Sequence, residues 1–286
     1  MKDLNGLYQN LRKNYLYYNF TTTIIKTKTI MEQDIYAAGQ EGFNLPHDVI
    51  QLPTQGVFYK SKKKSIKVGY LTAVDENILS DFDGRKNITE SIILPLLRNK
   101  LYEKDLRPEE LLDGDVEAIL LFLRNTAFGP EYKLTLIDPK TEDTFVASIM
   151  LDELNYKKTE HQVDENGFFN TVLPVSKRNV TLKLLSLADR MEIERIIKSY
   201  PSERVAPTIT TRLNKHIVSI DGNDDRVGIA TFVESMPIGD SKFIRKFVLD
   251  NEPRLDLKKE VIAPSGEKAV VDVAFGVEFF RPFFAI

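Results

Sequence analysis

The clearest pattern of hydrophobic and polar positions along the chain lies between Leu111 and Gly129. Apolar residues recur there at helical spacing, at Val116, Ile119, Leu120, Leu123 and Ala127, and further apolar residues occupy the opposite side. Asp115 is placed to accept hydrogen bonds from free amides of the first turn, and Gly129 followed by Pro130 is a typical helix end. The pattern predicts a capped helix that is buried on more than one face.

Alternation of apolar and polar residues predicts β-hairpins before and after this helix. Leu52–Tyr59 and Ile66–Leu71 are expected to pair across the lysine-rich segment 60–65, which is more typical of a charged hairpin tip than of a phosphate site. Two closing hairpins are expected, one from 132–137 and 144–149, the other from 255–262 and 268–273. The remaining periodic segments predict helices at 72–79, 88–101, 191–200, 207–220, 225–236 and 243–249.

Four sequence features occur twice in the same order. They are Leu-Pro at 52–53 and 173–174, a strand followed by Leu-[Thr/Ser]-x-x-Asp at 71–75 and 185–189, an Asp-Gly turn before a Phe-containing helix, and a closing hairpin with a proline in its turn. We aligned the helix after Asp115 with the one after Asp225, because Asp, Ile and Phe match and Gly129 falls opposite Gly239. In this alignment the helix at 243–249 has no counterpart in the first half.

The repeated features predict an α+β protein built by internal duplication. The expected organisation is an extended N-terminal arm at 1–50, a first module at 51–160 and a second module at 161–286. Each module would contain a hairpin, several helices and a closing hairpin.

The two ends of the chain carry the candidate interface residues. The arm has no sustained period, and Tyr15, Tyr17 and Phe20 are expected either to order against a partner or to pack loosely on their own domain. The C-terminal segment holds Phe279, Phe280, Arg281, Phe283 and Phe284, whose apolar area must be covered. These rings either complete the core of the second module or anchor the chain in a neighbouring subunit.

Composition and motifs argue against several classes of function. A net charge of −3 weighs against nucleic-acid binding, and the absence of cysteine excludes disulfides and thiolate metal sites. The three histidines lie far apart, no phosphate-binding glycine loop or nucleophile elbow occurs, and no run of about 18 apolar residues could span a membrane. We therefore expect no cofactor, no metal, no small-molecule substrate and no membrane partner.

Two acidic groups were considered as sites. The loop Asp221–Asp225 lacks the glycine and the final glutamate of a calcium loop, so a structural turn explains it better. A diffuse metal-dependent active site built from Asp75, Glu76, Asp113 and Asp115 remains an alternative.

A set of short motifs in fixed order resembles the baseplate protein family of T-even-like contractile-tailed bacteriophages. The motifs are Leu-Pro-x-x-Gly-x-x-Tyr at 52–59, Leu-Thr-Ala-x-Asp-Glu at 71–76, Leu-Leu-x-Gly-Asp at 111–115, Arg-x-x-Ala-Phe-Gly at 124–129 with Tyr132, and Phe-Phe-Arg-Pro at 279–282. The resemblance covers about 50–284. Some relatives carry Cys-x-x-Cys in the closing hairpins, but 138–141 and 263–266 lack cysteine here, so no metal knuckle is implied.

The resemblance implies a non-catalytic hub or hub-assembly subunit that is made in the host cytoplasm and built into the tail baseplate of the virion. Its partners would be other tail subunits, contacted through residues 1–50 and 277–286. The alternatives are a chaperone-like tail assembly factor that leaves before the particle matures, and the metal-dependent enzyme described above.

Overall fold

The computed structural model describes residues 46–80, 87–157, 159–201, 203–273 and Phe279. The chain divides into two units, 1–46 and 47–286, and the account below concerns the second. Almost all of the predicted arm therefore lies outside the described residues. Its last four residues, 47–50, belong to the first strand.

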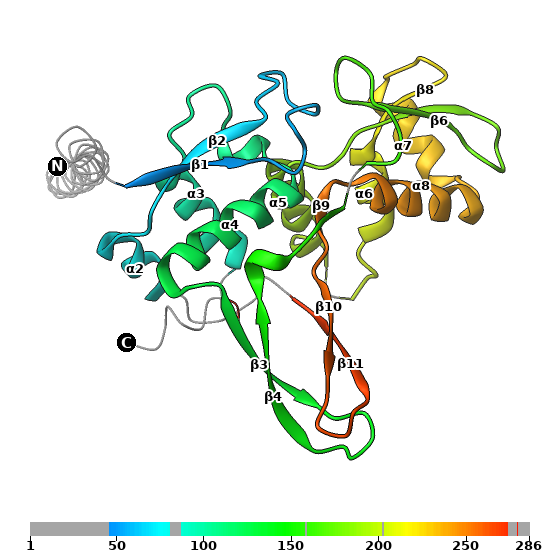
Figure 1. The fold of residues 1–286 in the computed structure, drawn as a ribbon. Helices are drawn as coiled ribbons and strands as arrows, with labels where there is room; N and C mark the ends of the chain where they lie inside the picture. Colours follow the sequence, from blue (N-terminus) through cyan, green and yellow to red (C-terminus); the bar gives the residue numbers. More distant parts are fainter. Residues whose placement is uncertain (1–45, 81–86, 158, 202, 274–278, 280–286) are drawn as a thin grey trace, which may run out of the picture. The chain divides into compact units, whose positions relative to one another are not determined.

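The first hairpin pairs β1 (His47–Gln51) with β2 (Ser65–Gly69) in antiparallel register, with Ile50 opposite Ile66 (Figure 1). The prediction of a strand at Leu52–Tyr59 was wrong. That segment is a series of turns, in which Gln55 N donates to Leu52 O at 2.9 Å and Val57 N to Thr54 O at 3.2 Å. Gly56 has φ +72° and a Cβ there would come within 2.3 Å of Lys63 O, so only glycine fits this turn.

Helices follow the hairpin as the periodicity predicted. α2 spans Ala73–Ser80, a π-helical turn spans Thr89–Ile93, and α3 spans Leu94–Lys100, with Pro95 in the turn that directly follows the π-helical one. A short 3₁₀ turn, Pro108–Glu110, leads into α4 (Asp113–Phe128).

α4 is the buried helix expected from the sequence, but its first turn is not capped by Asp115. Leu112 occupies the N-cap position without a side-chain cap bond, and Asp115 lies inside the first turn. The Asp115 carboxylate is fully buried and binds Thr54 and Tyr59 of the preceding loop instead. The expectation of a helix cap was therefore wrong, since a tertiary partner takes this carboxylate.

The two closing hairpins are present. β3 (Glu131–Ile137) pairs with β4 (Thr144–Met150), and β10 (Lys258–Ile262) pairs with β11 (Lys268–Asp272). They lie side by side in Figure 1, and Asp138 in the first hairpin turn accepts bonds from Ser265 N (2.9 Å) and Ser265 Oγ (2.6 Å) in the second. The short 3₁₀ turn Leu151–Glu153 follows β4, and β5 (Tyr156–Lys157) pairs with β9 (Arg254–Leu255).

The second half contains the three-stranded sheet β6-β7-β8, made of Phe169–Val172, Asn179–Leu182 and Ile217–Ile220. Its helices are α5 (Leu187–Lys198), α6 (Thr208–His216), α7 (Arg226–Glu234) and α8 (Ile238–Asn251). The expected helix at 207–220 was wrong in its last turn, because the β-branched residues from Ile217 onward pair with β7.

The buried carboxylate contact of α4 has a parallel in α8 and not in α7. Asp225 caps α7 through its own side chain, which accepts from Val227 N and Gly228 N, so it does not do what Asp115 does. Asp240 does: it is the third residue of α8, is fully buried, and accepts from Val175 N (2.8 Å) and Ser176 N (3.0 Å), just after Leu173-Pro174. The sequence alignment gives α8 no counterpart in the first half, whereas this contact resembles that of Asp115 in α4.

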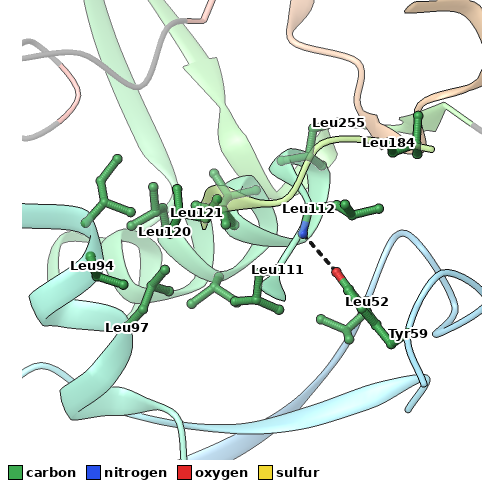
Figure 2. Close-up of a cluster of buried hydrophobic side chains, with 14 of the residues drawn as sticks. Leu52, Tyr59, Leu94, Leu97, Leu111, Leu112, Leu120, Leu121, Leu184 and Leu255 are labelled. Carbon is green, nitrogen blue, oxygen red and sulfur yellow. Dashed lines mark hydrogen bonds between the residues drawn. The ribbon is translucent and has the colours of Figure 1, made fainter. Parts of the chain in front are cut away.

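One continuous hydrophobic core contains residues from both halves of the sequence. Figure 2 shows Leu111 and Leu112 of the first half close to Leu184 and Leu255 of the second, with Tyr59 pointing toward the Leu112 amide. The Leu112 N to Tyr59 Oη distance is 3.0 Å.

Candidate interaction site

Of the eight candidate interface residues, the structure describes only Phe279. The aromatic residues of the arm and the segment from Phe280 to Phe284 lie outside the described residues. Phe279 is fully buried within this chain, with its ring centroid 6.2 Å from that of Tyr132.

Arg124 of α4 holds Phe279 and Tyr132 together. Its guanidinium lies 5.0 Å from the Tyr132 ring centroid and 5.6 Å from the Phe279 ring centroid. Two of its nitrogens donate to Gly129 O (3.0 Å) and Glu131 O (3.2 Å), which fixes the turn between α4 and β3. Arg124, the first residue of the Arg-x-x-Ala-Phe-Gly motif, thus forms one buried cation–π cluster with Tyr132 and Phe279.

The four acidic residues of the alternative active site have structural partners or are solvent-exposed. Buried Asp75 accepts from Thr72 N at 2.8 Å and forms an ion pair with Lys100, while Asp113 pairs with Arg190. Glu76 is exposed. Across the described residues, no group of three or more His, Asp or Glu side chains could hold a metal ion.

Asp115 is the most constrained of these carboxylates. It accepts from Thr54 N (3.0 Å), from Thr54 Oγ1 (2.7 Å) and from the Tyr59 hydroxyl. Burial raises the pKa of the Asp115 carboxyl to about 6, against the lowering effect of these hydrogen bonds. The same burial raises the pKa of the Tyr59 hydroxyl. The arrangement fixes the 52–59 turns onto α4.

The acidic loop at 221–225 is likewise structural. Asp221, in the left-handed region with φ 48°, accepts from Asn179 N at 2.8 Å and pairs with Arg178. The hydrogen bond from that amide lowers the pKa of the Asp221 carboxyl.

The outer faces of the two closing hairpins form an exposed surface that the sequence reasoning did not single out. Val146 and Ile137 are 69% and 65% exposed on the first hairpin, and Val270 and Ile262 are each 64% exposed on the second. The opposite faces carry the buried residues Ala147, Ile149, Ala269 and Val271. The alternating pattern indicated one buried face, and it also places apolar residues on the exposed face.

The link between the hairpin tips is also buried. Asp138 is 1% exposed, and hydrogen bonds from Ser265 and the nearby amides lower the pKa of its carboxyl to about 2. The outer faces are therefore held on two hairpins joined at their turns.

The protein-family comparison bears directly on these features. Residues 54–281 match the family model described as T4 bacteriophage base plate protein. The chain belongs to this family. The match begins at the buried Thr54 and ends two residues after Phe279. It therefore contains both the hydrogen bonds of Asp115 to Thr54 and the contact of Arg124 with Phe279.

No curated protein and no solved structure matches the chain in the other two comparisons. Within the part of the chain that the structure describes, no helix is long and apolar enough to cross a membrane.

Proposed function

We propose that this baseplate-family protein is a non-enzymatic structural subunit of a contractile phage tail, located in the hub region of the baseplate and acting through contacts with other tail subunits. The observation that carries the proposal is the family match over 54–281. The structural partners of Asp75, Asp113 and Asp115 support a scaffold role, because each carboxylate is engaged in fixing one segment to another. In this proposal the protein is made in the host cytoplasm and has no nucleic-acid, membrane or small-molecule partner.

We further propose that the scaffold arose by duplication, with modules near 51–160 and 161–286 sharing one core. In each half a buried Asp at the third position of a helix binds the chain just after a Leu-Pro pair, as Asp115 does with Thr54 and Asp240 with Val175. A shared core predicts that limited proteolysis near 155–170 does not release two stable halves. Two separately folded fragments would contradict the shared core.

The contact surfaces in this proposal are the N-terminal arm, the segment after Phe279 and the outer hairpin faces. Phe279 anchors the C-terminal segment on Arg124, and Phe280, Arg281, Phe283 and Phe284 beyond it are the proposed contacts. The exposed valines of the hairpins suit the same role, since apolar groups at that exposure gain most from being covered by a partner.

Variant phages test these surfaces. Val146→Asp and Val270→Asp alter exposed side chains within strands and should lower the stability of the isolated protein by no more than roughly 1–2 kcal/mol, since aspartate is unfavourable in a strand and the new carboxylate at position 270 would face Glu260. The proposal predicts reduced incorporation of both variants into tails, whereas Val205→Asp, a control at a 95% exposed position outside the hairpins, should be incorporated normally. Equal incorporation of all three variants would remove the hairpin faces from the mechanism.

Deletion of residues 1–45 tests the arm in the same assay. The deletion ends before β1, so the first hairpin is retained. Loss of incorporation with unchanged stability is expected, and unchanged incorporation would exclude the arm as a contact.

A further inference from the structure

Five charged side chains meet where α4, α5 and the segment after α8 come together, and we call them the junction cluster. They are Asp113 and Glu117 of α4, Arg190 of α5, and Glu252 and Arg254. Arg254 Nη2 lies 2.7 Å from Glu117 Oε1, Arg254 Nη1 lies 3.9 Å from Glu252 Oε2, and Arg190 pairs with Asp113. Three carboxylates thus face two guanidinium groups.

Two of these three carboxylates, those of Glu117 and Glu252, lie largely out of contact with solvent. Glu117 is 8% exposed, and its second oxygen, Oε2, is enclosed without a hydrogen-bond partner among the described residues. The Glu252 side chain is 13% exposed. A further charged group from α5, Glu194, acts on Arg190 and adds negative charge. An ionised carboxylate with an unpaired oxygen in such a place is costly, and protonation removes most of that cost.

The backbone prevents the cluster from relaxing by expansion. Gly114 packs so closely on the segment after α8 that a Cβ would come within 2.0 Å of Pro253 O. On the other side, Leu187 N donates to Leu111 O at 2.9 Å and holds α5 against the start of α4. The carboxylates therefore cannot separate without breaking backbone contacts.

We propose that the junction cluster holds one proton at neutral pH, shared between Glu117 and Glu252, and that losing this proton as the pH rises loosens the contact between α4 and residues 252–254. The protein would then carry a pH-sensitive joint between the two halves of its core.

The electrostatics of the two groups agree with this assignment. Burial raises the pKa of the Glu117 carboxyl to about 7, and burial followed by the nearby Asp113 charge raises the pKa of the Glu252 carboxyl to about 7. Both carboxyls face Arg254, and the Glu117 charge also acts on Glu252, so the two groups titrate as a pair. Both bind protons more tightly in the folded protein than in the unfolded chain, so the stability they contribute is complete at acid pH and is lost as the pH rises through about 7.

Carbon-detected NMR of protein labelled with ¹³C only at the glutamate carboxyls tests the proposal on the intact wild-type chain. At least one glutamate resonance should titrate with a midpoint near 7. Aspartates, including Asp115, are invisible in this experiment, so their titration cannot be mistaken for the cluster. A spectrum in which every glutamate titrates with a midpoint below about 5.5, near the unperturbed range, would overturn the proposal.

The Glu252→Gln variant provides a second test of the proposal. It removes the excess charge, so the midpoint of the remaining Glu117 resonance should shift downward by about one pH unit or more. The loss of thermal stability between about pH 4.5 and 7, the ordinary and the raised pKa, should become smaller. Glu234→Gln, at an exposed position at the end of α7, is the matched control and should change neither curve. If Glu252→Gln and Glu234→Gln behave alike, the shared proton is excluded.

Discussion

At Gly114 a single added methyl group should disturb the packing of α4 against residues 253–254. Gly114 lies in the first turn of α4, and a Cβ built there would sit 2.0 Å from Pro253 O, 2.7 Å from Arg254 Cα and 2.9 Å from Pro253 C. Carbon atoms in contact normally lie about 3.5–4.0 Å apart, so the two backbones would have to separate by more than 1 Å. All three atoms are backbone, so a side-chain rotation cannot relieve the overlap.

The expected cost of Gly114→Ala follows from two opposing effects. Overpacking of this kind costs roughly 1–3 kcal/mol and occasionally more, while alanine favours a helix over glycine by about 1 kcal/mol. The overlap is severe and also disturbs the Arg254–Glu117 pair, so we expect a net loss of about 2 kcal/mol or more in the free energy of unfolding. In a domain of this size that corresponds to a fall in Tm of roughly 4–8 °C.

Gly239 and Gly228 provide matched controls for the Gly114 prediction. Gly239 holds the corresponding place in α8, but a Cβ there would meet only Val175 Cγ2, at 2.8 Å, on a side chain that is 56% exposed and free to turn. Gly239→Ala should therefore cost less than about 1 kcal/mol. Gly228→Ala in exposed α7 should be neutral or slightly stabilising, because the nearest contact is the Asp225 carboxylate at 3.0 Å.

Urea unfolding monitored by circular dichroism, with the three variants measured in parallel, checks the prediction. A Gly114→Ala protein as stable as the wild type, or a Gly239→Ala protein destabilised more than Gly114→Ala, would refute the close backbone contact between α4 and residues 253–254.

Three further predictions concern the buried polar and aromatic contacts. Tyr59→Phe removes the hydroxyl that links Leu112 N to the Asp115 carboxylate and should cost about 1–3 kcal/mol in urea unfolding, because the amide is left buried without its acceptor; an unchanged midpoint would show that this link does not stabilise the fold. Phe279→Ala should cost roughly 3–5 kcal/mol in the same assay, since the ring is fully buried on Arg124; a loss below about 1 kcal/mol would mean that the ring does not dock there in solution. Because burial raises the Asp115 pKa from 3.8 to about 6, its contribution to stability should be complete below pH 3.8 and decline as the pH rises to about 6, by on the order of 3 kcal/mol, and a pH series of Asp115→Asn should lack this decline.

The parts of the fold governed by local periodicity could be predicted from the sequence. α4 shows this best: its apolar positions, its Gly129 end and its burial on more than one face all follow from residues within one segment. The closing hairpins were predictable for the same reason, since alternation and turn residues are local signals.

The errors arose where a residue's partner lies far away in the sequence. Asp115 has the type and position of a helix cap, and nothing local reveals that Thr54, 61 residues earlier, takes its carboxylate. The same reasoning made Asp225 its apparent equivalent, although Asp240 plays that role in the second half. Sequence identity over a few positions favours α7, whereas the hydrogen bonds to the residues after Leu-Pro, visible only in three dimensions, resemble those of α8.

The candidate contact residues likewise depend partly on local sequence and partly on partners that are distant in the sequence. Aromatic composition predicts that the rings of the C-terminal segment need cover. Phe279, the one of these rings that the structure describes, is covered by Arg124 and Tyr132 of the same chain. Composition could not predict this contact, because it depends on a cation supplied by α4. The sequence shows exposed apolar residues among the charged ones on the outer strand positions, but only the structure shows that Ala147, Ile149, Ala269 and Val271 on the other face are buried.

The measurement that tests the central claim most directly is quantitative mass spectrometry of purified mature particles. A structural baseplate subunit should be present at a fixed ratio to other baseplate proteins, and it should stay with the tail through purification. If the protein is found in tail assembly intermediates but is absent from mature particles, it is a transient assembly factor, and the proposed role as a permanent subunit is contradicted.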